Sequence, residues 1–167
     1  MYRAYVEVVT RYREVVAFGF LATFFTNFGQ TYFFGFYGAH FREAFDLSNT
    51  GFGTIYSAVT LCSAVAIIFI GHLIDKVRVA PYAVVLCLLL VVGCCLISSA
   101  TVLPLFILGL WMVRFLSHGL MGHMSSTVVT RYVEHGRGRG LSLASMGYAT
   151  GEVLFPIMVT GLFLVVG

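Results

Sequence analysis

Five apolar runs, each about as long as a membrane-crossing helix, dominate this chain of 167 residues. They lie near 15–38, 51–74, 80–99, 102–130 and 141–166. An α-helix needs about 20 apolar residues to cross the ~30 Å hydrocarbon core of a bilayer. The runs also lack the strict alternation of a transmembrane β-strand. The sequence therefore predicts an all-α membrane protein with about five transmembrane helices, surrounded by the lipid bilayer.

The composition excludes other classes of protein. Only 10% of the residues are charged and 59% are hydrophobic, whereas a soluble domain carries about a quarter charged residues. The net charge of +3 is small and dispersed, which argues against a nucleic-acid partner. The four cysteines lie inside apolar runs without a CxxC spacing, so they are interpreted as small buried hydrophobic residues rather than as disulfide partners or metal ligands.

Short polar junctions separate the runs and predict the orientation of the chain. Ser48 and Asn49 are suitable N-caps before the second run, and Pro81 suits a first helical turn. Basic residues gather in three segments that lie on one side of the membrane: Arg3, Arg11 and Arg13; Lys76 and Arg78; Arg131, Arg137 and Arg139. The opposite side has only Arg42. By the positive-inside rule the N-terminus is cytoplasmic, in a multi-pass protein of the cell (inner) membrane.

Residues 1–14 form a basic cytoplasmic tail before the bundle at 15–167. The tail is either a short interfacial helix or a frayed basic anchor, and the sequence does not separate these two readings.

Two charged residues fall well inside the predicted spans. Arg114 lies in LWMVRFLSHGLMGHMSS, and Glu152 lies on the next helix, which runs antiparallel to it. At ~1.5 Å per residue, Arg114 is roughly 18 Å from one face of the membrane and Glu152 roughly 16 Å from the other. A charge near the midplane costs several kcal/mol unless it is paired or hydrated. We therefore expect an ion pair or a shared polar cavity that serves an anionic solute or a coupled proton.

Helical spacing adds neighbours to this centre. Arg114, His118, Met121 and Ser125 follow a spacing that places them on one face of an α-helix, whereas His123 points elsewhere. His118 is either part of the polar centre or a packing residue. A second polar stripe on the first span is either part of the solute pathway or a set of interhelical hydrogen bonds. It consists of Thr23, Asn27, Gln30 and Thr31.

The second span ends in GHLIDKVR, residues 71–78, where a glycine is followed by an acid and two bases. By its place after the second span, this motif resembles the signature G-x-L-x-D-R/K-x-G-R-K of the major facilitator superfamily of transporters. Gly71, Leu73, Asp75 and Lys76 match it, whereas Arg78 occupies the later glycine position and the final basic pair is replaced. The resemblance implies that this loop gates the conformational change, chiefly through Asp75.

Two further motifs are similar to those of the superfamily. Arg114, Gly119 and Gly122 resemble the R-x-x-x-G motif of the fourth helix, with one extra residue before the first glycine. On the fifth run, Gly138, Gly147 and Gly151 fit the spacing of the antiporter signature, but Glu152 stands where proline is expected. Gly147 and Gly151 also predict close helix packing, and Pro156 predicts a bend.

The resemblance implies the N-terminal part of a secondary transporter that is built from two six-helix halves and moves a small solute by alternating access. The resemblance also implies that the polar stripes of the first and fourth helices face the central cavity. On this reading the chain is a fragment whose partner is the missing C-terminal half. The alternative is a small multi-pass membrane protein that acts as an interaction or assembly partner without transport.

An enzyme and a bound cofactor are not expected. No HExxH pattern occurs, and the two mid-span histidines, His118 and His123, share one helix and point apart, which does not suit a transmembrane haem.

Overall fold

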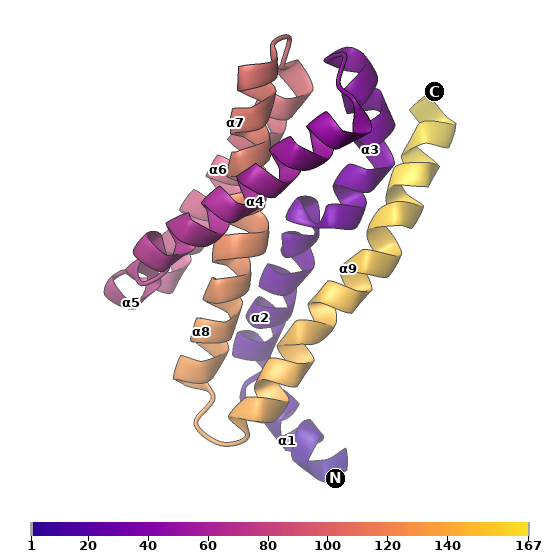
Figure 1. Ribbon diagram of the computed structural model, residues 1–167. Coiled ribbons are helices and arrows are strands. Elements are labelled where there is room, and N and C mark those ends of the chain that lie inside the picture. The colour runs from indigo at the N-terminus through magenta and orange to yellow at the C-terminus, as the bar shows by residue number, and fades with distance from the viewer. Residues whose placement is uncertain (1, 167) are drawn as a thin grey trace. The chain divides into compact units, whose positions relative to one another are not determined.

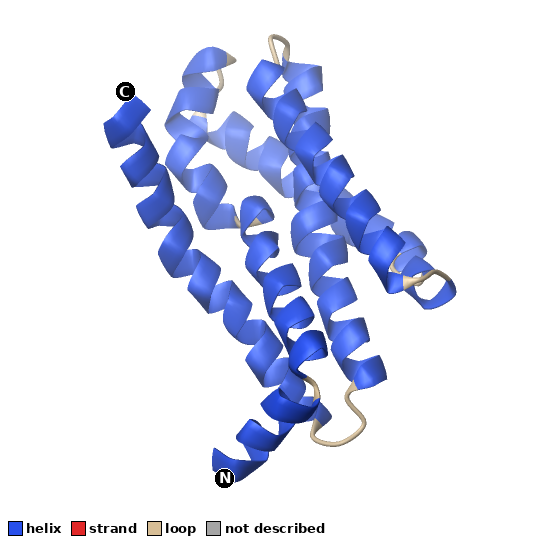
Figure 2. Cartoon of the chain, turned by 180° about the vertical axis from the view of Figure 1, so that it is seen from behind, coloured by secondary structure: helices blue, strands red, loops and turns tan. Residues whose placement is uncertain are grey.

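The computed structural model describes residues 2–166, which fold into helices joined by short connections, with no strand in that range (Figures 1 and 2). The predicted all-α class is confirmed. The α-helices are α1 (Tyr2–Arg11), α2 (Arg13–Phe25), α3 (Thr31–Ala44), α4 (Asn49–Ile70), α5 (Leu73–Lys76), α6 (Val79–Ser99), α7 (Leu103–Val113), α8 (Gly122–Tyr132) and α9 (Arg137–Val166). A 3₁₀ turn, η1 (Thr26–Gly29), and a π-helical segment, η2 (Arg114–Met121), complete them.

Three helical stretches within the described residues are long and apolar enough to cross a bilayer. They are Asn49–Lys76, Val79–Ser99 and Leu103–Tyr132, and they coincide with the second, third and fourth apolar runs. The first run differs from a single span, because η1 divides it into α2 and α3. The total of about five spans stays a prediction.

Local sequence signals explain several helix boundaries. The Ser48 hydroxyl accepts a hydrogen bond from the Gly51 N–H at 3.0 Å, so Ser48 is the N-cap of α4, as the sequence predicts. Pro81 and Pro104 lie in the first turns of α6 and α7, where a missing N–H costs no helical hydrogen bond. The N-terminal tail is helical over Tyr2–Arg11, which favours the first of its two readings.

The chain forms two compact units, which are described separately. Unit 1 comprises residues 1–27 and 121–167, and unit 2 comprises residues 28–120. In unit 1, α2 packs against both α8 and α9 (Figure 1). Gly19 permits this packing, because a Cβ there would lie 2.7 Å from Val129 Cγ2 and 2.9 Å from Ala144 Cβ. Two valines, Val8 and Val16, complete an apolar core with Val129 and Ala144.

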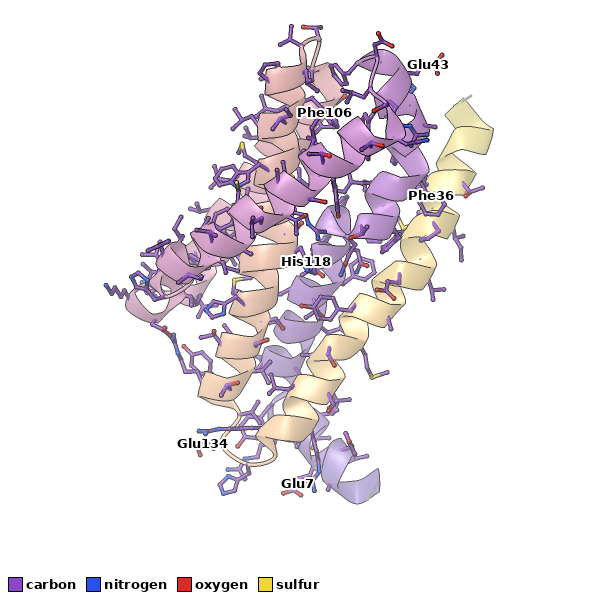
Figure 3. All side chains as sticks on the ribbon, in the orientation of Figure 1. Glu7, Phe36, Glu43, Phe106, His118 and Glu134 are labelled. Carbon is purple, nitrogen blue, oxygen red and sulfur yellow. The ribbon has the colours of Figure 1, made fainter. Side chains whose placement is uncertain are left out.

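In unit 2, α6 packs along α7, while α4 contacts both α7 and α3. Glycines again permit close contact: a Cβ at Gly109 would lie 2.9 Å from Ile97 Cγ1. Phe106 is fully buried, with its ring centroid 4.7 Å from that of Phe41 and 5.0 Å from that of Phe45 (Figure 3). These contacts fix α3 and α7 on one another and position the polar residues described next.

Candidate functional site

The first apolar run is interrupted at its middle. α2 ends at Phe25, η1 follows, and Gln30 adopts an extended conformation (φ −75°, ψ 150°) before α3 begins. Such a break removes backbone carbonyls from the regular helical ladder, and at membrane depth these groups need other partners. The carbonyl of Gly29 is one of them.

Arg114 supplies that partner inside unit 2. Its side chain is buried, with 8% of the residue exposed, and its Nη1 donates a hydrogen bond to the carbonyl oxygen of Gly29. Its Nε donates to Thr60 Oγ1 at 3.2 Å, and its guanidinium carbon lies 4.9 Å from the centroid of the Tyr56 ring. The helix break, α4 and η2 thus converge on one cation.

A second layer of hydrogen bonds holds these partners in place. The Tyr56 hydroxyl donates to Thr31 Oγ1 at 2.9 Å, which ties α4 to the first turn of α3. The Thr60 hydroxyl donates to the Tyr56 carbonyl at 2.9 Å, so its oxygen is oriented to accept from Arg114. Among the described residues, the partners of the guanidinium are all neutral: a carbonyl, a hydroxyl and an aromatic face.

Gly29 must be a glycine for this arrangement to form. A Cβ at this position would overlap the hydroxyl of Ser117 and lie 3.1 Å from the Val113 carbonyl oxygen. Ser117 is fully buried. The close approach of the η1 backbone to η2 is what brings the Gly29 carbonyl within reach of Arg114.

The segment that carries Arg114 is a π-helix rather than an α-helix. A π-helix forms i→i+5 hydrogen bonds and turns less per residue than an α-helix. Residues four apart still lie close to one face, so this winding does not separate Arg114 from His118. Arg114 is buried and His118, labelled in Figure 3, is exposed. A role for His118 in the polar centre stays a prediction.

Polar residues of α2 and η1 make a different kind of contact, inside unit 1. The Thr23 hydroxyl donates to the Ala144 carbonyl of α9, and Asn27 Nδ2 lies 3.4 Å from the Tyr148 carbonyl oxygen. Both residues are buried. Of the two interpretations of the polar stripe on the first apolar run, these contacts favour interhelical hydrogen bonding for Thr23 and Asn27. Gln30 belongs to unit 2, where it is half-buried and precedes α3 without capping it through its side chain.

The predicted packing glycines lie at close contacts. A Cβ at Gly147 would overlap Thr23 Oγ1 and the Phe20 carbonyl oxygen, and one at Gly151 would overlap the side chain of Asn27. In α8, a Cβ at Gly122 would lie 2.7 Å from the Tyr148 hydroxyl. In unit 2, a Cβ at Gly119 would lie 3.2 Å from Ile67 Cδ1. Pro156 lies inside α9, which continues through it to Val166.

Glu152 is exposed on α9 in unit 1, whereas Arg114 belongs to unit 2. Their pairing stays a prediction. The GHLIDKVR motif lies at the end of α4 and in the short helix α5. Gly71 is buried, while Asp75, Lys76 and Arg78 are exposed. Ile74 is fully buried and anchors this turn.

Next to Arg114, unit 2 contains an aromatic cavity of about 540 Å³. It lies among α3, α6 and α7, and its lining includes Phe28, Phe33, Phe34, Tyr37, Phe41 and Phe45. Phe34 links the cavity to the arginine cluster, since its ring centroid lies 6.0 Å from that of Tyr56. The cavity suits an apolar group and the guanidinium suits a negative one.

Sequence reasoning missed Gly29, Tyr56 and Thr60. Tyr56 and Thr60 are polar residues four apart in an apolar span, a spacing that places both on one helix face. That signal was available, although nothing in it named Arg114 as the partner.

Comparison with protein families identifies the class of this architecture. The sequence model of the Major Facilitator Superfamily matches residues 19–167. The chain belongs to this superfamily. Its members are membrane transporters, so the chain is a multi-pass membrane protein of the transporter class. Comparisons with curated proteins and with solved structures find no match.

Proposed function

We propose that this major facilitator chain takes part in secondary transport of a small anionic solute, with Arg114 at the centre of the binding site. Transport proceeds by alternating access in the cell (inner) membrane, with the N-terminus in the cytoplasm. The single observation that carries the proposal is a buried guanidinium whose partners, in the part of the chain that the structure describes, are all neutral.

The electrostatic argument concerns the net charge of the site. Moving a guanidinium out of water is costly, and neutral hydrogen-bond partners offset only part of that cost. They also leave the positive charge of Arg114 uncancelled. An arriving anion would supply the missing charge, and a charge-assisted hydrogen bond to Arg is about twice as strong as a neutral one.

The interrupted helix supports the same site. In many secondary transporters, discontinuous helices form the solute site near the bilayer midplane, because their ends offer unpaired backbone groups. Here the break at Thr26–Gly29 offers the Gly29 carbonyl, which Arg114 uses. A change in the solute's contact with Arg114 would therefore act directly on the junction between α2 and α3.

Two further roles rest on the predicted depth of these residues in the membrane and on the family resemblance. Glu152 carries the coupled proton or pairs with Arg114, while His118 and Gln30 line the path. Gly71, Asp75, Lys76 and Arg78 form the gating loop.

The test is transport by the protein that carries this chain, reconstituted into liposomes under an inward proton gradient. Uptake of radiolabelled phosphate, succinate and citrate is compared with that of glucose as a neutral probe. Arg114→Ala is expected to abolish uptake of the transported anion without loss of expression. Glu152→Gln is expected to abolish proton-driven uptake, and retention of solute counterflow would assign it to the proton rather than to the solute.

Arg42→Gln is the matched control, because Arg42 belongs to the same unit but lies near the end of α3, away from the Arg114 contacts. Arg114→Lys separates charge from geometry. Full uptake by both Arg114→Ala and Glu152→Gln would contradict the proposed centre. Failure of the wild type to transport any probe, with a stable product, would favour the interaction-partner reading.

A further inference from the structure

One end of unit 1 contains a feature that the transport site does not use: α1 is held against the loop between α8 and α9. Val8 of α1 is 4% exposed and packs into the core with Val133 at the start of that loop. Gly136 in the loop has φ +78°, a conformation that favours glycine. A Cβ there would also lie 2.9 Å from Val8 Cγ2. The loop is therefore shaped to receive α1 closely.

A small cavity of about 60 Å³ lies between α1 and this loop. Its lining carries two arginines, one histidine and one acid: Arg11, Arg139, His135 and Glu7. The two arginines and Glu7 together carry one net positive charge. Figure 3 labels Glu7 on α1 and Glu134 in the neighbouring loop.

Tyr12 also lines this cavity, and its hydroxyl is buried without a hydrogen-bond partner among the described residues. A buried, unpaired hydroxyl costs about 1–3 kcal/mol, so a polar group that reaches it would stabilise this end of unit 1. A water needs about 10–15 Å³ of such volume, and the cavity therefore holds roughly five non-hydrogen atoms. That is the size of a phosphate group and is too small for an organic solute.

The surroundings of the cavity are those expected at a membrane surface. The cavity lies where α8 ends and α9 begins, and the α7–η2–α8 stretch is long and apolar enough to cross a bilayer. On α1, Val6 and Val9 are each 41% exposed, next to the cavity-lining Val8. A helix that combines exposed valines with arginines suits the interface, where the apolar groups reach the acyl chains and the arginines reach the headgroups.

We propose that this cavity binds the phosphodiester of an anionic phospholipid, with Arg11 and Arg139 as charged donors and the Tyr12 hydroxyl as a neutral donor. A phosphodiester carries one negative charge, which balances the net charge of the lining. The headgroup of phosphatidylglycerol adds no further charge. That of phosphatidylcholine adds a cation, which the two arginines disfavour. A bound lipid would fix α1 to the loop between α8 and α9.

The test uses the purified full chain in dodecyl maltoside micelles that contain increasing fractions of phosphatidylglycerol. The measurement is the rise in the thermal unfolding midpoint, from which a half-saturating lipid fraction is obtained. Each arginine near anionic lipid contributes about 1 kcal/mol, so Arg11→Gln and Arg139→Gln are each expected to raise that fraction about fivefold. Tyr12→Phe, which removes only one oxygen atom, is expected to raise it about threefold.

Arg13→Gln is the matched control, because Arg13 is two residues from Arg11 but its side chain is 80% exposed and faces Glu14 at 3.9 Å. It is expected to shift the half-saturating fraction less than twofold. Equal shifts in Arg13→Gln and Arg11→Gln would overturn the proposal, since they would indicate general surface attraction. Equal stabilisation by phosphatidylcholine, or by inorganic phosphate at the same concentration, would also overturn it.

Unfolding midpoints in lipid-free micelles check that each variant folds. Tyr12→Phe keeps the aromatic ring and so keeps the proposal testable if an arginine variant does not fold.

Discussion

The two units use similar polar side chains in different ways. In unit 1, the Thr23 and Ser125 hydroxyls donate to backbone carbonyls of neighbouring helices, Ala144 and Gly19 respectively. Each bond joins two neutral groups and leaves no net charge. In unit 2, Tyr56 and Thr60 instead surround the charged side chain of Arg114. Polarity inside a membrane bundle therefore indicates packing where the partners are backbone carbonyls, and a candidate site where they enclose a charge.

The largest expected effect tests the packing side of this comparison. In unit 1, Gly151→Val places a side chain where the buried Asn27 lies. Because overpacking of a tight contact costs about 1–3 kcal/mol or more, we expect the unfolding midpoint to fall sharply or folding to fail. Gly161→Val is the control in the same helix, since a Cβ at Gly161 has no neighbour within 4 Å. Thermal unfolding in detergent measures both variants, and equal midpoints would contradict the close packing of α9 on α2.

The next effect tests the charged site of unit 2, through the Tyr56 ring that contacts Arg114. Tyr56→Leu removes the aromatic face that lies 4.9 Å from the guanidinium carbon. A desolvated cation–π contact is worth about 2 kcal/mol, and each ~1.4 kcal/mol corresponds to about a tenfold change. We therefore expect anion uptake to fall about thirtyfold in Tyr56→Leu. Tyr56→Phe keeps the ring and should stay within about twofold of the wild type.

The relative uptake of the two Tyr56 variants decides how this second result is interpreted. If Tyr56→Phe loses as much uptake as Tyr56→Leu, the hydroxyl bond to Thr31 matters more than the ring. If both variants keep full uptake while Arg114→Ala does not, Tyr56 only packs against the arginine.

The sequence predicts the helices better than it predicts their interruptions. Long apolar runs and a cap at Ser48 suffice to place α4 and α6, because helix formation in a membrane depends on local hydropathy and end signals. The break at Thr26–Gly29 has no proline to announce it. Its carbonyl partner, Arg114, lies 85 residues further along the chain. The break therefore depends on a tertiary contact that no local pattern encodes.

The residues of the candidate site also differ in how well the sequence predicts them. Arg114 can be found from the sequence, because an isolated charge in an apolar run is conspicuous. Its partner Thr60 is 54 residues away and resembles any other small polar residue of a membrane helix. Sequence periodicity also does not predict the π-helical winding of Arg114–Met121 or the exposure of His118. The sequence does not reveal these local conformations, because they form together with close tertiary packing.

The smallest expected effect tests a neutral interhelical hydrogen bond in unit 1. Thr23→Val removes a hydroxyl that donates to α9 while keeping the side-chain shape. Interhelical hydrogen bonds of this kind contribute about 0.6 kcal/mol on average, so we expect a small fall in the unfolding midpoint and no loss of anion uptake. Thr54→Val is the matched control, because its hydroxyl bonds only the Thr50 carbonyl of its own helix. If Thr23→Val instead removes uptake while stability is unchanged, Thr23 belongs to the transport path and the division between packing polarity and site polarity fails in unit 1.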